Sequence, residues 1–223
     1  WDEFTGDIKF DDEVQGYQTD FTHDEFTSGK KFERKLVDDD QYGVIERRTR
    51  LMALGARRRK ERDGASVFNN AFSSGFTGGD ALSLCNSAHT SRNDAALTRS
   101  NTGTLTLTDP NVEAVRRLMI AQRTGTGEVA DVMPDMLIAP LALERPAWEI
   151  INTKGKVDTA NNNANFHMGR YKLLVWPNYL TSSTAWWMVD SKLMKEFLLW
   201  FNRVPVQFFK DRDYGTLISP FAG

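Results

Sequence analysis

Residues 38–72 read DDDQYGVIERRTRLMALGARRRKERDGASVFNNAF, and they contain the strongest helical segment of the chain. Apolar side chains recur along it at helical spacing, namely Val44, Ile45, Leu51, Met52, Leu54, Ala65, Val67, Phe68, Ala71 and Phe72. The aspartates at 38–40 can accept hydrogen bonds from the first helical turn and complement the positive end of the helix dipole. The pattern predicts one helix over 38–72, about 34 residues and about 50 Å long. Such a helix indicates an elongated protein, because a globular domain rarely needs one.

Charge is divided unevenly around this helix. Residues 1–40 carry 13 acidic and 5 basic side chains, whereas residues 41–64 carry 3 acidic and 8 basic ones. The remaining residues are nearly neutral, and the whole chain has a formal charge of −2. Neighbouring segments of opposite charge are typical of surfaces that meet other surfaces.

The basic side chains on the predicted helix allow two functional hypotheses. They are Arg47, Arg48, Arg50, Arg57, Arg58, Arg59, Lys60 and Arg62. One hypothesis is a nucleic-acid-binding module that contacts phosphates through this stripe. The other is a solvated helix that pairs with acidic residues of the preceding segment, in the same copy or in a neighbouring one. We favour the second, because only a stripe of the chain is basic.

The acidic segment before the helix, residues 1–37, alternates aromatic and polar residues and is punctuated by glycines. This pattern predicts two or three strands joined by turns. The segment buries little on its own, so we expect a protruding β-hairpin arm, with an edge sheet of the main domain as the alternative. The chain opens at Trp1 without an initiator Met, and we expect a processed chain or a fragment with a segment missing in front.

After the helix, strands and helices are predicted in mixed order. Residues 73–103 are rich in Gly, Ser, Thr and Asn and predict an ordered long loop or a small hairpin. Short strands are expected at 104–108, 136–139, 171–176, 185–189 and 204–209. Helices are expected from Asp109 to near 125, from 141 to 151, and from Asp190 through 201. No regular βαβ rhythm is present, so the fold class is α+β.

Composition and motifs exclude several classes of protein. With 223 residues, 40% hydrophobic and 26% charged, the chain is an ordinary globular one, and no apolar run approaches the roughly 20 residues that span a bilayer. Cys85 is the single cysteine, which excludes an intramolecular disulfide. Cys85 and His89 are two potential ligands without a third, and no nucleotide-binding or hydrolase motif is present. We therefore expect no enzyme activity, no metal and no cofactor.

Several motifs follow one another in a familiar order. The helix ends in the Phe68-Asn69-Asn70-Ala71-Phe72 sequence, and Gly79-Asp80-Ala81-Leu82 follows with His89 downstream. Leu137-Ile138-Ala139-Pro140 comes next, and YKLLVWPNYL at 171–180 precedes a Trp-Trp pair. In this order the chain resembles the major capsid proteins of tailed phages with the Hong Kong 97 fold, especially the branch of the Mu-like major head subunit. That branch has a second glycine where this chain has Ala81.

The resemblance implies a division of the chain. Residues 1–37 would form the extended E-loop, and residues 38–107 a peripheral domain built on a spine helix. Residues 108–200 would form the axial domain, and residues 201–223 would return as a strand to the peripheral domain. The implied function is a major head protein that assembles into an icosahedral shell around packaged double-stranded DNA.

The resemblance also implies the partners and the place of assembly. The chain would bind copies of itself in hexamers and pentamers, with portal, scaffold and decoration proteins as further candidate partners and no membrane. It would assemble in the host cytoplasm and end in the virion. Because charges of opposite sign attract across interfaces, our candidates for contacts between copies are Asp11, Asp12, Glu13, Lys30, Lys31, Arg57, Arg58 and Arg59.

Overall fold

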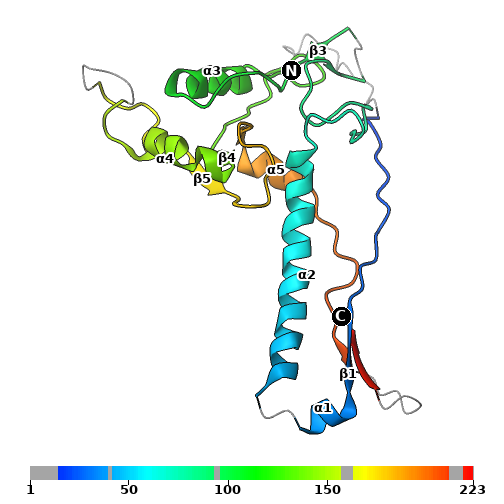
Figure 1. The fold of residues 1–223 in the computed structure, drawn as a ribbon. Helices are drawn as coiled ribbons and strands as arrows, with labels where there is room; N and C mark the ends of the chain where they lie inside the picture. Colours follow the sequence, from blue (N-terminus) through cyan, green and yellow to red (C-terminus); the bar gives the residue numbers. More distant parts are fainter. Residues whose placement is uncertain (1–14, 40–41, 93–95, 157–162, 211–217, 223) are drawn as a thin grey trace, which may run out of the picture.

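The computed structural model describes residues 15–39, 42–92, 96–156, 163–210 and 218–222, which form an elongated molecule (Figure 1). A body of short strands and helices lies at one end, and one long helix projects from it as a leg. The helices are α1 (Arg34–Asp38), α2 (Val44–Asn69), α3 (Asp109–Ile120), the 3₁₀ helix η1 (Leu141–Leu143), α4 (Glu144–Asn152) and α5 (Ser191–Phe197). The strands are β1 (Gly29–Glu33), β2 (His89–Thr90), β3 (Thr98–Arg99), β4 (Met136–Ala139), β5 (Lys172–Val175), β6 (Trp187–Val189), β7 (Phe209–Lys210) and β8 (Ile218–Ala222). None of the described helices is long and apolar enough to cross a membrane.

The predicted long helix is confirmed as α2, but it begins at Val44 and not at the aspartates. Its N-cap is Gly43, whose φ of +64° lies in the left-handed region, where glycine has no steric penalty and a right-handed helix cannot continue. Asp38 instead ends the short helix α1, and Asp39 is the C-cap of α1. The predicted aspartate cap is therefore wrong, since a glycine turn separates the two helices. With 26 residues, α2 is about 39 Å long.

Little of α2 is fully buried by its own chain. Its buried residues are Ala65 and Phe68, both near its C-terminal end. Leu51, in the first half of the helix, is 55% exposed, and Leu54 is also exposed. The apolar stripe that predicted this helix is therefore covered by the body only over its last turns. Of the remaining stripe, Leu51 and Leu54 are exposed and could contact a partner.

The last turns of α2 dock on a sheet in which β4 lies between β5 and β6. β4 runs parallel to β5 and antiparallel to β6. Side chains alternate across β4, so Ile138 packs in one cluster with Phe68 and Trp187, while Leu137 and Ala139 belong to a second cluster. The second cluster is completed by Leu107, Val112, Ala147, Ile150, Ile151, Tyr171 and Met188. One sheet thus joins the leg to the layer of α3 and α4, and the mixed α+β architecture is confirmed.

A second sheet, with strand order β1-β8-β7, joins segments from the two ends of the chain at the foot of the leg (Figure 1). β1 pairs antiparallel with β8, from Gly29 opposite Ala222 to Glu33 opposite Ile218. Residues 15–28 are extended and contain no strand. The predicted hairpin within 1–37 is therefore wrong for the described part of that segment, because the strand it does form pairs with a strand from the C-terminal end. Residues 1–14 lie outside the described residues.

Of the two elements predicted directly after α2, one is confirmed and one is wrong. Residues 73–103 contain the small hairpin of β2 and β3, as predicted. The predicted strand at 104–108 is wrong, because side chains take its carbonyl groups: the Trp186 indole donates to the Leu105 carbonyl and the Asn111 amide to that of Thr106.

The Asp190 cap is confirmed, since its carboxylate accepts hydrogen bonds from the backbone N–H groups of Lys192 and Leu193. The helix that it caps, α5, is shorter than predicted and ends at Phe197. The strand predicted at 204–209 is wrong except at its last residue, where β7 begins. Residues 198–208 are extended and lie outside every sheet that the structure describes.

Two glycines of α2 provide a matched test of how tightly the helix docks. A Cβ at Gly64 would lie 3.1 Å from Cη2 of Trp176, whereas a Cβ at Gly55 would meet nothing within 4 Å. Gly55→Ala should raise the free energy of unfolding by about 1 kcal/mol, the difference in helix propensity. Gly64→Ala should give no gain, because the added methyl displaces Trp176. Urea unfolding followed by circular dichroism measures both, and an equal gain from the two substitutions would contradict the close contact.

Candidate interaction surface

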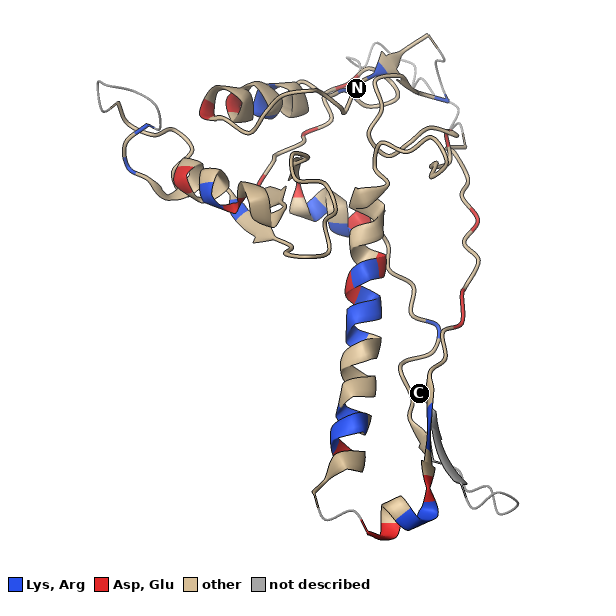
Figure 2. Cartoon of the chain, viewed as in Figure 1, with Lys and Arg blue, Asp and Glu red and all other residues tan. Residues whose placement is uncertain are grey.

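The basic face of α2 is the largest concentration of one charge on the described chain (Figure 2). Two of its arginines contact aromatic rings of the segment that precedes α2 in the same chain. The guanidinium of Arg59 lies 4.0 Å from the centroid of the Phe26 ring and pairs with Asp63 at 2.9 Å. Arg48 lies over the ring of Phe32, 5.7 Å from its centroid. Arg59, a predicted contact between copies, is therefore already used within one copy.

Arg57 and Arg58 have a different environment from Arg59. Both are exposed, and together they line a hollow of about 230 Å³ at the junction of α2 and the body. Its other lining residues are Leu54, Glu61, Trp176, Pro177 and Tyr179. The Glu61 carboxylate accepts a hydrogen bond of 2.9 Å from the Trp176 indole, which fixes the floor of the hollow. No ion pair to Arg57 or Arg58 occurs among the described residues. The structure thus presents two unpaired guanidinium groups beside an aromatic surface.

Residues 15–28, which we call the arm, are fixed to the body at their upper end. The Tyr17 hydroxyl lies 3.0 Å from that of Thr90, and Arg92 donates to the Gly16 carbonyl at 2.9 Å. Gly79 allows the arm to approach closely, because a Cβ there would lie 2.9 Å from Oγ1 of Thr19. These contacts fix the arm to the loop that follows α2.

The acidic residues of the arm do not pair with α2 in the described part of the chain. Asp20, Asp24 and Glu25 are exposed, and none of them forms an ion pair with a basic residue of the helix within the ranges described. The acidic residues of the arm are therefore available to pair with basic residues of another copy.

The remaining predicted contact residues lie apart from the hollow that Arg57 and Arg58 line. Lys30 and Lys31 are exposed on β1 at the foot of the leg, in register with Phe221 and Pro220 of β8. β1 is an edge strand of its sheet, so its outer side is free of strand pairing in the described structure. The predicted acidic residues Asp11, Asp12 and Glu13 lie outside the described residues. The structure therefore brings Arg57 and Arg58 together and separates them from Lys30 and Lys31.

The Gly79-Asp80-Ala81-Leu82 motif serves to fix the loop after α2. Nδ1 of His89 lies 2.5 Å from Oδ2 of Asp80, and the same carboxyl group accepts a hydrogen bond from the Leu82 N–H. Burial alone would raise the pKa of Asp80, but these hydrogen bonds hold it below its usual range. Ala81 has a φ of +61°, in the left-handed region that favours glycine.

Cys85 and His89 do not form a nucleophile pair. The imidazole is bound to Asp80, and burial raises the pKa of the Cys85 thiol, which disfavours the reactive thiolate. Within the described ranges, no group of three or more His, Cys, Asp or Glu side chains lies close enough to hold a metal ion.

A largely buried polar cluster, which the sequence did not predict, links the first residue of α3 to the segment just before β5. Nε2 of His167 lies 3.8 Å from Oδ1 of Asp109, and Nζ of Lys156 lies 3.1 Å from the same carboxyl group. The Tyr171 hydroxyl lies 3.4 Å from Nδ1 of His167. His167 is only 1% exposed, and this burial lowers its pKa, so the ring is neutral near pH 7. The cluster ties elements together in the interior and lines neither of the hollows described here.

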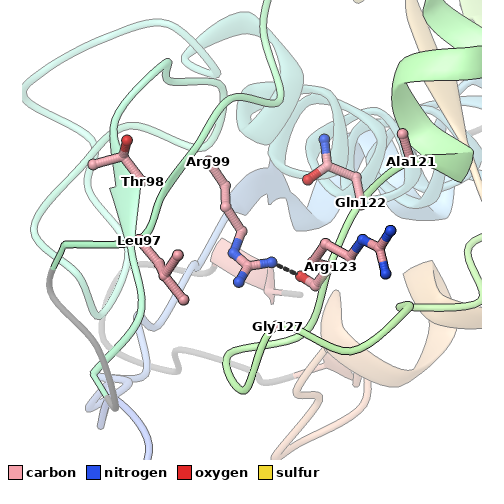
Figure 3. A pocket seen from close by; sticks show the side chains of 7 residues that line it. All are labelled: Leu97, Thr98, Arg99, Ala121, Gln122, Arg123 and Gly127. Atoms are coloured by element: carbon pink, nitrogen blue, oxygen red, sulfur yellow. Dashed lines mark hydrogen bonds between the residues drawn. The ribbon is translucent and has the colours of Figure 1, made fainter.

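A second hollow, of about 360 Å³, lies between the β2–β3 hairpin and the turn after α3 (Figure 3). It is lined by Leu97, Thr98, Arg99, Ala121, Gln122, Arg123 and Gly127. Arg99 crosses it and donates to the backbone carbonyl of Arg123. None of the described residues that line this hollow is acidic, and no His or Cys is among them.

Comparisons with known proteins give two matches. The sequence model of a family described as phage capsid protein matches residues 16–218. The solved capsid of bacteriophage JBD30, decorated with minor capsid protein trimers, is similar with a TM-score of 0.50 and 16% sequence identity. This similarity covers 69% of this chain and 74% of that chain, and at such low identity it concerns the fold. Among curated proteins, no sequence matches this chain.

Proposed function

The chain belongs to the phage capsid protein family, and on that premise we propose that it builds its shell as a subunit of the Hong Kong 97 type. Its function in that family is structural: it forms the shell of the phage head and is a component of the virion, not an enzyme. Membership of that family favours a shell subunit over a separate nucleic-acid-binding module.

The observation that carries the proposal is the exposed length of α2. An isolated subunit gains little by extending a helix about 39 Å long whose buried residues all lie near one end. A subunit surrounded by copies of itself gains a spine along which neighbours pack. The likeness to the JBD30 capsid supports the same arrangement of the chain.

In this proposal the chain is divided as the family resemblance implies. Residues 1–37 form the E-loop arm, 38–107 the peripheral domain with the spine helix, 108–200 the axial domain and 201–223 the returning strand. The pairing of β8 with β1 supports a return of the C-terminal end to the spine side of the molecule. The packing of β4 between α2 on one face and α3 and α4 on the other supports a firm connection between the spine helix and the axial domain.

Contacts between copies follow from the charges left open within one copy. Arg57 and Arg58 bind acidic residues of the N-terminal segment of a neighbour, with Asp11, Asp12 and Glu13 as their partners. Lys30 and Lys31 line the free edge of β1 and contact a second neighbour there. Arg59 contributes indirectly, by holding its own arm through Phe26.

Further partners are proposed for the assembled shell. Copies of the chain form hexamers and pentamers, since one repeated contact between identical subunits closes into rings. The shell encloses double-stranded DNA and connects to portal and scaffold proteins. The JBD30 capsid carries trimers of a minor capsid protein, and a decoration protein of this kind is a candidate partner here.

Electron microscopy of the purified chain under a range of assembly conditions tests the proposal. We expect closed shells of uniform diameter with five-fold and six-fold clusters of subunits. Only small, monodisperse particles under every condition would argue against self-assembly. Shells whose subunits lack an elongated spine would argue against the Hong Kong 97 type alone.

A further inference from the structure

The chain carries a long apolar segment that its own fold leaves uncovered. Residues 197–209 read FLLWFNRVPVQFF and contain one charged residue, Arg203. Their exposed apolar side chains are Phe197, Leu198, Leu199, Trp200, Phe201, Val204, Val206, Phe208 and Phe209, each 40–75% exposed. We call this segment the aromatic strip. It runs from the body toward the foot of the leg, beside α2 (Figure 1).

The size of the strip distinguishes it from ordinary exposed apolar residues. At those exposed fractions, the nine side chains offer on the order of 1,000 Å² of surface. The largest apolar patch of a typical monomer is about 300–600 Å². One partner in a standard protein interface contributes about 800 Å². The summed exposed area of the strip is therefore comparable with one side of a standard interface.

Within its own chain the strip makes few contacts that would cover it. The ring of Phe201 lies 5.2 Å from that of Phe21 in the arm, and both rings are still more than half exposed. Residues 198–208 join no sheet in the described structure, so their backbone adds an unpaired edge to the apolar side chains. The arm and the strip thus extend one surface, since Phe26 of the arm is also exposed.

We propose that the aromatic strip is buried against a second copy of this chain in the shell. This rests on the proposed self-assembly, in which copies of the chain surround each subunit. The strip has the area that a stable contact needs and lies beside the two elements, arm and α2, whose charges are open to neighbours. Its near lack of charge suits an apolar partner surface. The strip therefore supplies the apolar core of a contact whose rim is the charged arm and helix.

A matched pair of substitutions tests the strip. Trp200→Glu should lower the yield of shells by more than about tenfold, because each contact would bury an unpaired carboxylate. Trp200→Phe keeps an aromatic ring and should assemble like the unaltered chain. Both variants should unfold as monomers at the same temperature as the unaltered chain, since Trp200 is 57% exposed. Shells formed by Trp200→Glu in normal yield would overturn the proposal.

A labelling measurement gives a second answer that does not depend on that variant. With Cys85→Ser removing the native thiol, Val204→Cys places one thiol in the strip. We expect maleimide to react with it about tenfold or more slowly in shells than in dissociated subunits. Equal rates in both states would show that no copy covers the strip. Slow reaction in dissociated subunits would show that the chain covers it itself, and vesicle binding by the subunits with equal rates would assign it to a lipid surface.

The two proposals fail in different ways. If the unaltered chain forms no shells, self-assembly is wrong whatever the strip does. If it forms shells and the strip stays reactive in them, self-assembly stands and the role of the strip is wrong.

Discussion

Replacing Phe68 with alanine should lower the free energy of unfolding by about 3–5 kcal/mol, the usual cost of removing a buried phenylalanine. Phe68 is only 7% exposed and lies in the last turn of α2. Its ring packs edge-on against Trp187 at 5.4 Å and against Trp176 at 6.3 Å between centroids. Its removal opens a cavity at the junction of the leg and the body, so the loss concerns the joint that orients the whole spine.

Phe72 offers a control of the same residue type, one turn further along the chain. It also stacks on Trp187, at 6.4 Å between centroids, but it is 52% exposed. Phe72→Ala should therefore cost about 0.5–1.5 kcal/mol, the value of an aromatic pair at the surface. Urea unfolding of both variants, followed by circular dichroism, gives the two free energies. Equal losses of unfolding free energy in the two variants would contradict a special role of Phe68 at the junction of α2 and the body.

Elements with a local cause could be predicted from the sequence. The helical spacing of apolar residues predicted α2, and Asp190 predicted the cap of α5 through hydrogen bonds to residues two and three positions on. Pro140 directly follows β4, as the short apolar run before it indicated. In each case the deciding residues are neighbours in the chain.

Elements with a distant cause could not be predicted in the same way. β1 pairs with β8, about 190 residues further along the chain, and no local pattern around β1 identifies that partner. The start of α2 was missed because three aspartates were a stronger capping signal than the single Gly43. The polar cluster of Asp109 and His167 joins residues 58 positions apart, so it is visible only in the fold.

The candidate site shows the same limit. Arg57, Arg58 and Arg59 are adjacent and equivalent in the sequence, yet only Arg59 faces Asp63 and the ring of Phe26. The sequence gives the charge of the helix and not the surroundings of each arginine. The sequence also does not distinguish apolar residues that are buried in a core from apolar residues that are exposed in the subunit. The aromatic strip was therefore expected to continue a helix and form a strand, although its side chains are exposed.

Reversing the charge of both Arg57 and Arg58 should have a large effect on assembly and little effect on the subunit. Both side chains are exposed and have no ion pair in the described part of the chain, so the double change to glutamate should alter the free energy of unfolding by less than about 0.5 kcal/mol. In the shell, however, glutamates would face the acidic N-terminal segment of a neighbour. Like charges across an interface cost several kcal/mol, so the yield of shells should fall by about a hundredfold or more.

Two further variants make that result specific to charge. Changing both arginines to lysine keeps the positive charges and should preserve assembly, which sedimentation and electron microscopy can measure. Changing Asp11, Asp12 and Glu13 to lysine in the double glutamate variant should restore shells, because the attraction returns with its sign reversed. Restoration would identify the acids at 11–13 as the partners of this hollow. If shells remain absent while the subunit stays folded, the two arginines meet some other surface. If the double glutamate variant assembles normally and loses only DNA affinity, the basic helix faces the packaged DNA and not a neighbouring arm.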